Sequence, residues 1–524
     1  MFVLLSGVFK CLPIGDKMSK RIMLIKPAYE TDAVWDTIRT SHPLGLWWIS
    51  SALKERGHEV RLLDETVRGC GLEKRTMFRR ETYGTESVDI PSECSYEDFQ
   101  HQKMQDFNTL DPREFAKKYS SFEGDKIVRN MVRTGTPLEK TLDEVGRMDP
   151  DFVGIPIFAS CNYPAALTLA RAVRSNFPDA KIVMGGQHAT AQPIEVVTTG
   201  ADYVVTGDAV SAMINLVEMG SDRKVIFGGV ADIRNFPLLD MELMAENAYP
   251  FRPTHAYDTK GRRSVDYMFS KGCFRSCEFC VAGEKENKVS TTNLEKIDEQ
   301  LKRFADAGIE EIIVQDDAFL FKPQKNLRSY LELMKKYGFY WQDNGGIEFE
   351  GLTPVVIEML MEYQGKGCGR INSLYVPLNP RKGALTGSAL KDMQKRFADH
   401  FPHVMALRES GIYVCTSEII GYPGQSLDSM EEDVRLHQEL VRNGYADKSM
   451  TFVTSTLPGT RLHRERNGFI VNPLDWAGYS NFVPQSVTDT VPNIQDIEWM
   501  TVLRNKEMNK VQVSYSWGST FPNE

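Results

Sequence analysis

The stretch K-G-C-F-R-S-C-E-F-C, residues 271–280, places Cys273, Cys277 and Cys280 at the spacing C-x3-C-x2-C. Three thiolates so close in sequence can share one compact metal site only if the backbone loops around it, as an iron–sulfur cluster requires. A zinc ion would need a fourth ligand, and no C-x2-C or H-x3-H pair lies nearby to supply one. Three cysteines on a cluster of four irons leave one iron open to a chelating small molecule.

With the aromatic Phe279 just before its last cysteine, this loop resembles the cluster loop of the radical S-adenosylmethionine (SAM) superfamily. A strand-like segment at 265–270 enters the loop, and a helix-like run from about 291 to 307 follows it. The resemblance implies a 4Fe-4S cluster whose open iron is chelated by the amino and carboxylate groups of SAM. It also implies that an electron from the cluster cleaves SAM to methionine and a 5′-deoxyadenosyl radical.

Length and composition bound the other possibilities. The chain has 524 residues, 42% hydrophobic and 25% charged, enough for two or three domains with cores of their own. A net charge of −9 without a basic run argues against nucleic acid as a partner. Nine scattered cysteines and a labile cluster predict the cytoplasm. Residues 1–20 contain neither a signal peptide nor a membrane span, so we expect an N-terminal extension, with Met18 as an alternative start.

Between residues 21 and 229, strands and helices alternate as in a doubly wound α/β domain. Helices are expected at 46–56 and 164–176, and strands at 21–25, 58–63, 152–158, 181–184 and 202–206. Such alternation predicts a parallel sheet with its ligand at the carboxyl ends of the strands. Residues 68–136 interrupt the pattern, and their length predicts a helical insertion or lid.

This Rossmann-like region resembles the cobalamin-binding domain that precedes the barrel in many radical SAM enzymes. The likeness rests on Pro27 and on segments at predicted strand ends: H-P-L-G-L at 42–46, Ala159-Ser160, G-G-Q-H-A-T at 185–190 and D-Y-V-V-T-G-D at 202–208. It implies cobalamin contacts from Pro27, Leu44, Gly45, Ser160, Gly185, Gly186, Gln187, His188 and Gly207. Paired glycines there would let the flat macrocycle approach the backbone, although a G-G pair is also a common tight turn.

One departure concerns the cobalt. The D-x-H-x-x-G motif, by which other cobalamin proteins ligate cobalt through histidine, is absent. We expect His188 to pack near the ring or to hydrogen-bond a corrin amide rather than to ligate the metal. Cobalamin held in this way would exchange readily between methylcobalamin and its strongly nucleophilic reduced state.

After a turn-rich linker at 230–263, six strand–helix units are expected between 264 and 465. The later strands are expected at 310–315, 340–349, 370–376, 412–420 and 450–456. Six such units resemble the partial (β/α)6 TIM-like barrel of radical SAM enzymes, whose site lies at the carboxyl ends of the strands. An aromatic segment at 466–524 should pack the last helix against the barrel or cap its mouth.

The barrel's strand ends acquire SAM-binding roles through the same resemblance. Phe279 would offer a backbone contact to the adenine edge, and Gly421 and Pro423 of the G-Y-P-G turn would lie against the adenine. Glu418 points along the strand that leads into this turn.

Two carboxylates end the second barrel strand. Asp316 and Asp317 correspond to the position where polar groups approach the amino group of SAM, with a helix cap or a solvated turn as the alternative for each. The segment at 376–381 lacks the glutamate that relatives often carry near the SAM ribose, so no ribose contact is assigned.

Together the resemblances imply an enzyme, a cobalamin-dependent radical SAM methyltransferase that methylates an unactivated carbon of a small-molecule or lipid precursor. SAM would serve twice, once to methylate the corrinoid and once as the radical source. The pairing suits an sp3 carbon, which has no lone pair to attack SAM but can accept a methyl group once it is a radical. A flavodoxin or ferredoxin would supply electrons, and no residue is expected as a general base.

Two alternatives stay open. The same two-domain plan serves cyclisation, rearrangement or oxidation in which cobalamin delivers no methyl group. A non-catalytic corrinoid-binding protein is the other alternative, and the intact set of three cysteines argues against it.

Overall fold

The computed structural model describes most of the chain. The described residues are 19–35, 41–67, 75–83, 86–124, 126–245, 247, 261–282, 289–320, 324–347, 349–365, 370–378 and 387–511. Residues 1–18 of the expected N-terminal extension, Met18 included, and residues 246 and 248–260 of the expected linker lie outside the described residues.

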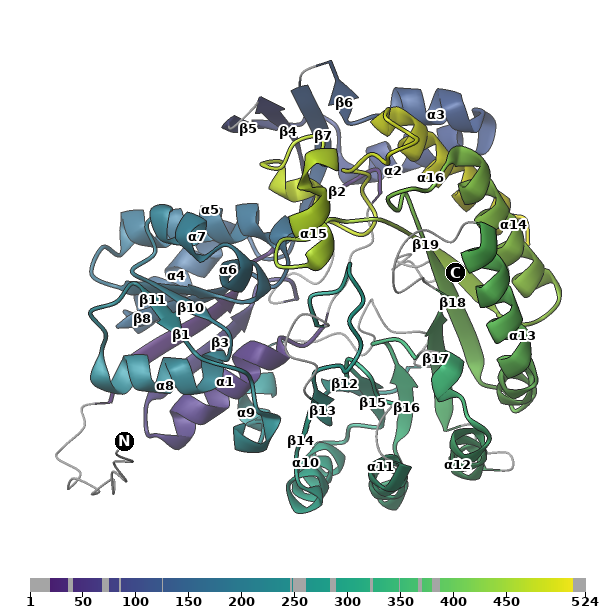
Figure 1. Cartoon of the computed structure of the whole chain (residues 1–524). Coiled ribbons are helices and arrows are strands. Elements are labelled where there is room, and N and C mark those ends of the chain that lie inside the picture. The colour runs from purple at the N-terminus through teal and green to yellow at the C-terminus, as the bar shows by residue number, and fades with distance from the viewer. Residues whose placement is uncertain are drawn as a thin grey trace, which may run out of the picture.

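The front half is a parallel six-stranded sheet in the order β11-β10-β9-β8-β1-β3 (Figure 1). Its strands are β1 (Arg21–Lys26), β3 (Glu59–Asp64), β8 (Phe152–Pro156), β9 (Lys181–Gly185), β10 (Tyr203–Thr206) and β11 (Val225–Phe227). Helices α1 (Leu44–Glu55) and α8 (Ala209–Met219) cover one face, while α4 (Leu138–Met148), α5 (Tyr163–Asn176) and α7 (Pro193–Thr198) lie on the other. Both faces are covered, which explains why β1 is apolar throughout: Leu24 packs with the first group and Met23 with the second.

The back half is a second parallel sheet in the order β12-β15-β16-β17-β18-β19. These strands are β12 (Ser264–Tyr267), β15 (Glu311–Val314), β16 (Tyr340–Asp343), β17 (Ile371–Pro377), β18 (Tyr413–Ile420) and β19 (Lys448–Val453). They alternate with α10 (Leu294–Asp306), α11 (Gln324–Lys336), α12 (Pro354–Gln364), α13 (Gly387–Glu409) and α14 (Leu427–Arg442). Because β12 and β19 stay at the two edges, the barrel is open, and the expected fold class is confirmed.

The insertion differs from expectation in part, because it contains a β-sheet as well as helices. Antiparallel strands β2 (Tyr29–Asp32), β7 (Lys126–Thr134), β4 (Arg75–Tyr83) and β5 (Glu86–Pro91) form it, with β6 (Phe122–Glu123) beside β7 and with helices α2 (Tyr96–Thr109) and α3 (Pro112–Lys118). The many charged residues of these strands make them hard to recognise in the sequence. Arg80 is buried, with the buried Glu30 at 3.0 Å and the exposed Asp89 at 2.7 Å, so charged residues that look solvent-exposed in the sequence can be paired inside.

The C-terminal segment joins this insertion. Its last helix, α16 (Ile494–Asn509), packs on α3 and α14. The buried Arg129 of β7 lies 2.6 Å from Asp475, and Ser120 donates to Glu498 at 2.6 Å. The segment at 466–511 therefore packs its last helix against the barrel, as expected, and it packs against the insertion as well.

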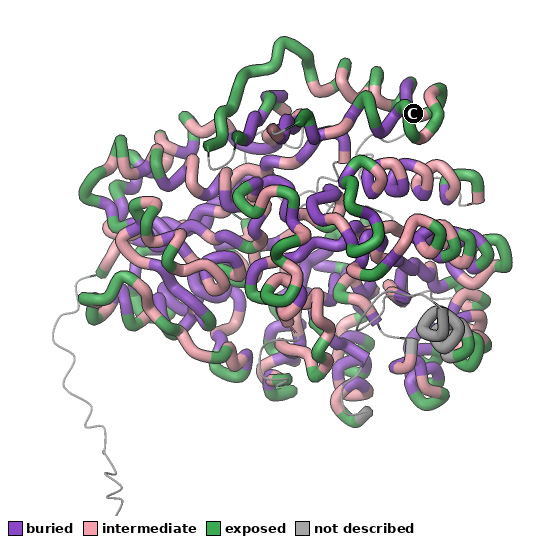
Figure 2. The backbone as a smooth tube through the Cα atoms, turned by 45° about the horizontal axis from the view of Figure 1, so that its top comes forward, coloured by how far each residue is buried: buried purple, intermediate pink, exposed green. Residues whose placement is uncertain are grey.

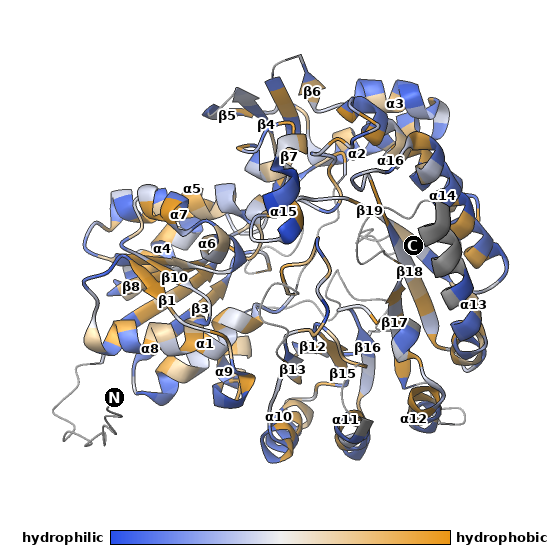
Figure 3. Cartoon of the chain, in the orientation of Figure 1, coloured by the Kyte–Doolittle hydropathy of each residue, from blue (hydrophilic) through white to orange (hydrophobic). Residues whose placement is uncertain are grey.

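The two sheets share one apolar core. Trp47 and Trp48 of α1 face Phe304 of α10 and Phe236, with ring centroids 6.5 Å and 5.0 Å apart. Figure 2 shows buried backbone running through the middle of the molecule, and Figure 3 shows apolar strands between helices with hydrophilic outer faces. Within the described part of the chain, none of the helices has the length and apolar character that a membrane crossing needs.

Candidate functional site: the cysteine loop and the corrin edge

The cysteine loop is irregular and half-buried. It follows β13 (Ser270–Lys271), which pairs with β14 (Ser290–Thr291), and Gly272 turns the chain with a φ of +98°. Cys273, Cys277 and Cys280 are half-buried and are not in disulfide bonds. The backbone N–H of Arg275 donates to Sγ of Cys273 at 3.4 Å. Soft thiol ligands on a looping backbone, with an N–H directed at sulfur, fit an iron–sulfur cluster.

Carboxylates from the second barrel strand hold the entrance of this loop. Asp316 is fully buried and accepts hydrogen bonds from Phe269 N at 2.7 Å, Ser270 N at 2.8 Å and Ser270 Oγ at 2.6 Å. The exposed Asp317 accepts from Gly272 N at 2.9 Å. Asp316 is neither a helix cap nor a solvated turn, whereas Asp317 lies in an exposed turn and still binds the backbone of the loop. Both lie beside the cluster loop, and the oxygens of Asp316 are already committed to the backbone there.

The far end of the loop meets the G-Y-P-G turn. Phe279 and Tyr422 make an edge-to-face contact at 6.4 Å, and the Tyr422 hydroxyl donates to Glu278 Oε1 at 2.5 Å. Burial, reinforced by this bond to Glu278, raises the pKa of Tyr422. Arg461 of α15 (Arg461–Arg466) donates to Glu278 Oε2 at 3.0 Å. The structure thus brings Phe279 next to the turn that contains Gly421 and Pro423, as the resemblance implied.

Sequence reasoning missed Glu278, Tyr422 and Arg461. The available signal was the acidic residue between two cysteines of the loop, since a carboxylate beside metal-binding thiols needs partners that offset its charge. Its partner Tyr422 lay inside a turn that had already been singled out for its glycines.

The structure does not support Glu418 as a SAM contact. Successive residues of a strand point to opposite faces, and Ser417 meets the Tyr375 hydroxyl at 2.6 Å inside the barrel. Glu418 therefore points outward, where it pairs with Arg504 of α16 and lies 2.6 Å from Nδ1 of His437 on α14. Burial alone would raise its pKa, but Arg504 and His437 lower the pKa of Glu418 to about 2. We withdraw Glu418 from the candidate site.

Glu418, Asp433 and His437 have the residue types and the spacing of a metal site. Ligand atoms of Glu418, Asp433 and His437 lie within 4.8 Å of one another. The guanidinium of Arg504 already supplies positive charge to this pocket, so we interpret the group as the anchor of α16 on the barrel.

The carboxyl ends of the front strands and the loops after them, which carry the candidate cobalamin contacts, are called the corrin edge below. Two glycines there are required by the local backbone conformation rather than by a ligand. Gly186 has a φ of +108°, and a Cβ there would lie 2.4 Å from the carbonyl oxygen of Ile157. Gly207 has a φ of +75°, and its Cβ would lie 2.3 Å from the carbonyl oxygen of Gly229. Gly45 is different, because a Cβ there would meet nothing within 4 Å. Open space beside exposed backbone, the condition for approach by a flat ring, exists at Gly45.

His188 is packed inside the protein. It is 2% exposed, with Nδ1 3.0 Å from Ser160 Oγ and with the rings of Tyr163 and Trp476 at 4.5 Å and 4.8 Å. Burial lowers the pKa of His188 to about 4, so the ring is neutral near pH 7. The expectation that His188 packs near the corrin ring or hydrogen-bonds a corrin amide stays a prediction. Trp476, expected against the barrel, instead covers this histidine of the front half.

The other candidate corrin contacts lie at the carboxyl edge of the front sheet. Pro27, Leu44, Gly185 and Gln187 are half-buried there. Phe158 was expected inside a buried strand, yet β8 ends at Pro156 and leaves Phe158 75% exposed. A large exposed aromatic side chain at a ligand-binding edge fits the apolar face of a corrin, and this residue was missed.

One segment touches both sites. After β19 the chain passes Gly459, whose added Cβ would lie 3.1 Å from Cβ of Ala191 in α6 (Gln187–Ala191). Three residues later, Leu462 N donates to the carbonyl oxygen of Glu278 at 2.9 Å. Residues 459–462 therefore connect the corrin edge with the cysteine loop.

Two family models match these regions. A model described as the B12 binding domain matches residues 125–217, and one described as the radical SAM superfamily matches residues 267–437. The second match runs from β12 to α14 and contains the three cysteines.

Curated relatives are distant. The cytidylyl-2-hydroxyethylphosphonate methyltransferase of Streptomyces wedmorensis is 22% identical over 503 residues, which cover 86% of this chain and 83% of that protein. A ribosomal protein uS12 methylthiotransferase RimO of Aquifex aeolicus is 26% identical over 38% of this chain and 46% of its own length.

Solved structures share the fold. The radical SAM methyltransferase TsrM from Kitasatospora setae aligns with a TM-score of 0.50 and 14% identity, covering 85% of this chain and 76% of that one. The cobalamin-dependent SAM radical enzyme OxsB aligns with a TM-score of 0.55 and 13% identity, covering 90% of this chain and 65% of that one. Such coverage includes both sheets. The chain therefore contains a region that matches the B12 binding domain, followed by one that matches the radical SAM superfamily, and the cofactors that these two regions imply are cobalamin, a 4Fe-4S cluster and SAM.

Proposed function

We propose that this enzyme transfers the methyl group of SAM to an unactivated carbon of a small organic molecule. The observation that carries the proposal is the bridge formed by residues 459–462, which contacts α6 at the corrin edge and Glu278 in the cysteine loop. A methyl donor and a radical source are useful to one substrate only if they face the same small volume.

When bound, the corrinoid would supply a nucleophilic carrier for the methyl group, and the reduced cluster would supply the electron that cleaves SAM. The chain's own residues would position these groups. Cys273, Cys277 and Cys280 would hold three irons, while Asp316 and Asp317 fix the loop that carries them.

The proposed SAM contacts are the exposed carboxylate of Asp317 toward its amino group, and Phe279, Gly421 and Pro423 toward its adenine. The proposed corrin contacts lie along the front edge at Pro27, Leu44, Gly45, Phe158, Gly185, Gly186, Gln187 and Gly207. Ser160 and His188 would support that edge from beneath.

We further propose an acceptor among small-molecule or lipid precursors, with a phosphonate as the first candidate. The relative that matches over most of both chains is named for methylating a phosphonate conjugate. The balance of atoms and electrons requires two molecules of SAM and two electrons for each methyl group transferred. One SAM leaves as S-adenosylhomocysteine and the other as methionine and 5′-deoxyadenosine.

A reduced flavodoxin or ferredoxin is the proposed electron donor, acting in the cytoplasm. The cysteine loop reaches the surface at Phe274, which is 37% exposed, so an electron carrier has access to it.

The test uses anaerobically reconstituted protein with SAM whose methyl group is deuterated, incubated with extracts of cells that lack the protein and, separately, with hydroxyethylphosphonate conjugates. We expect a product that carries the intact labelled methyl group, together with S-adenosylhomocysteine and 5′-deoxyadenosine. Formation of 5′-deoxyadenosine with an altered but unlabelled product would contradict methyl transfer and would establish rearrangement or oxidation. Absence of any SAM cleavage under reduction would establish a corrinoid-binding protein without radical chemistry.

A further inference from the structure

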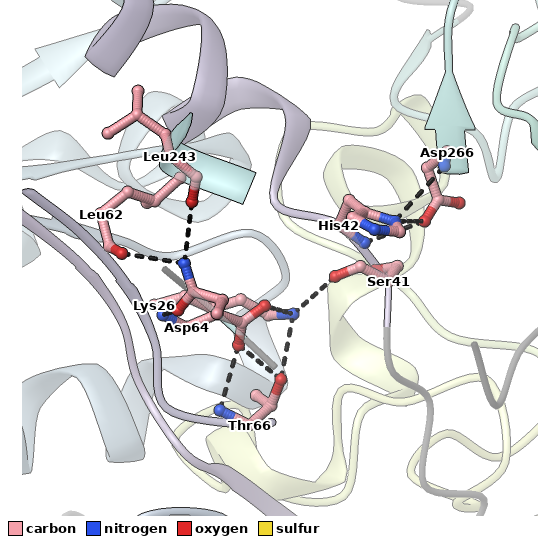
Figure 4. A network of polar contacts seen from close by, with 9 residues as sticks. Lys26, Ser41, His42, Leu62, Asp64, Thr66, Leu243 and Asp266 are labelled. Carbon is pink, nitrogen blue, oxygen red and sulfur yellow. Dashed lines mark hydrogen bonds and ion pairs between the residues drawn. The ribbon is translucent and has the colours of Figure 1, made fainter. Parts of the chain in front are cut away.

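His42 links the two halves of the molecule through Asp266 (Figure 4). Its Nδ1 atom lies 2.7 Å from Oδ2 of Asp266, and its backbone N–H donates to the same oxygen at 2.9 Å. Both side chains are 1% exposed. The backbone N–H of Asp266 also lies 3.3 Å from Nδ1 of His42. An ionised carboxylate can only accept, so beside it the His42 ring donates from Nδ1.

The pair is held from both sides. In the front half, Lys26 at the end of β1 donates to the carbonyl oxygen of Ser41 at 2.9 Å and to Asp64 of β3 at 3.1 Å. In the back half, Gln315 after β15 donates to Oδ1 of Asp266 at 2.5 Å. A continuous series of hydrogen bonds therefore runs from the carboxyl ends of two front strands to two barrel strands.

These hydrogen bonds join the corrin edge to the strand that leads into the cysteine loop. His42 immediately precedes α1 and the exposed Gly45 of the corrin edge, whereas Asp266 lies on β12, the strand that leads into the cysteine loop. Trp47 stacks with the His42 ring at 6.0 Å and belongs to the apolar core shared by both sheets.

The apolar core and the His42–Asp266 pair constrain the two halves of the molecule in different ways. Apolar contact holds surfaces together but is non-directional, so it leaves their relative orientation loosely defined. A buried hydrogen bond to a carboxylate is directional, and misplacing it leaves a desolvated acceptor unsatisfied. The His42–Asp266 pair is thus suited to fixing how the corrin edge faces the barrel.

We propose that His42 and Asp266 are positioning residues that fix the distance between the corrin edge and the SAM-binding strand ends. They thereby set how bound SAM divides between loss of its methyl group and reductive cleavage. The inference rests on the proposed function, because only demethylation of SAM requires both halves, whereas reductive cleavage requires the barrel alone.

The chain offers matched variants. Asparagine places an N–H donor close to the position of Nδ1, so His42→Asn keeps the bond to Asp266, whereas His42→Ala removes it and His42→Gln displaces the donor. His58→Gln is the control, since His58 is a buried histidine of the same domain at the opposite end of the sheet, where Lys20 N donates to its Nδ1 at 3.2 Å. Each variant is reconstituted with cluster and cobalamin, and its iron and cobalt contents and its thermal unfolding are compared with the wild type.

Two readouts follow. Pulsed EPR of the partly reduced protein gives the distribution of distances between the paramagnetic cluster and cob(II)alamin. Incubation with SAM and reductant, without acceptor, gives the ratio of S-adenosylhomocysteine to 5′-deoxyadenosine. We expect the wild type, His42→Asn and His58→Gln to share one narrow distribution and one ratio. In His42→Ala and His42→Gln the distribution should broaden, and the ratio should fall roughly tenfold, because small misplacements of reacting groups are costly.

A folded His42→Ala protein with normal metal content, a narrow distribution and an unchanged ratio would overturn the inference. So would an Asn variant as defective as the Gln variant, and this pair decides the matter if the Ala variant does not fold. Failure of the proposed function looks different: the wild type itself would form 5′-deoxyadenosine without S-adenosylhomocysteine, while the distance distributions would still test the positioning role.

Discussion

The cysteine loop and the corrin edge are built in opposite ways. The loop concentrates its three ligands within residues 273–280, on an irregular backbone that Asp316 and Tyr422 hold in place from distant strands. The edge collects its candidate contacts from residues 27–207, and its most conspicuous glycines serve the packing of the backbone. A ligand set bonded to metal leaves a compact signature in sequence. A surface that holds a flat ring by contact does not, and its residues must be separated from those that merely shape the edge.

The largest effect should come from the loop. Cys277→Ser removes one of three cluster ligands, so we expect loss of bound iron and of all reductive SAM cleavage, while cobalamin stays bound to the separate front sheet. Iron and cobalt analysis of reconstituted protein, with assay of 5′-deoxyadenosine, checks this. Cys94→Ser is the matched control, because Cys94 is an exposed free thiol of the insertion. Loss of cobalt together with iron would show that the two sites are not built independently.

At the corrin edge, two glycines should respond differently. Gly186→Ala meets the backbone of Ile157 and an unfavourable φ, so we expect about 4 kcal/mol lower stability even without cobalamin. Gly45→Ala should raise stability slightly, because alanine favours helix α1 and its methyl group meets no clash, and should weaken cobalamin binding, because the methyl group fills the space open to the ring. Urea unfolding of the cofactor-free protein and cobalamin titration check both. Equal stability of Gly186→Ala and Gly45→Ala would contradict the distinction between a glycine required by the backbone and a glycine that cobalamin approaches.

The loop should also depend on its anchor. Asp316→Ala deletes the acceptor of three hydrogen bonds and leaves two buried backbone N–H groups unsatisfied, so we expect about 3 kcal/mol lower stability and weaker iron retention. Asp316→Asn keeps one acceptor oxygen, so its stability and iron retention should lie between those of Asp316→Ala and the wild type. Chemical denaturation and iron content after gel filtration provide the measurement, and unchanged iron retention in the Ala variant would mean that the loop holds its shape without Asp316.

The smallest effect should lie at the amino ends of the barrel strands, away from both sites. Burial lowers the pKa of Lys448 to about 8, with Cys415 opposing, against an ordinary value of 10.5. Since the folded-state pKa is the lower one, stability falls as pH drops from 10.5 to about 8 and is constant below. Lys448→Met should therefore be more stable than the wild type at pH 7 by about 2 to 3 kcal/mol, an advantage that disappears near pH 10.5. A pH-independent difference between the two proteins would contradict this.

Much of the architecture was predictable from residue patterns. Apolar runs such as 21–25 and 152–156 mark strands covered on both faces, and the short cysteine spacing specifies a looped metal site. The β-sheet of the insertion was not predictable, because ion pairs such as Arg80–Glu30 bury charges that a sequence presents as solvent-exposed. The direction of Glu418 depends on Arg504, 86 residues further along, and strand residues give no sign of which face a remote helix will cover. The His42–Asp266 contact, 224 residues apart, was hidden for the same reason.

The central claim is that SAM and a corrinoid meet in one cleft between the two sheets. The most direct test incubates a single reduced, reconstituted preparation with SAM, with and without cobalamin, and measures both nucleoside products. We predict 5′-deoxyadenosine in both samples and S-adenosylhomocysteine only where cobalamin is bound. Abundant 5′-deoxyadenosine without S-adenosylhomocysteine from cobalamin-loaded protein would contradict the claim.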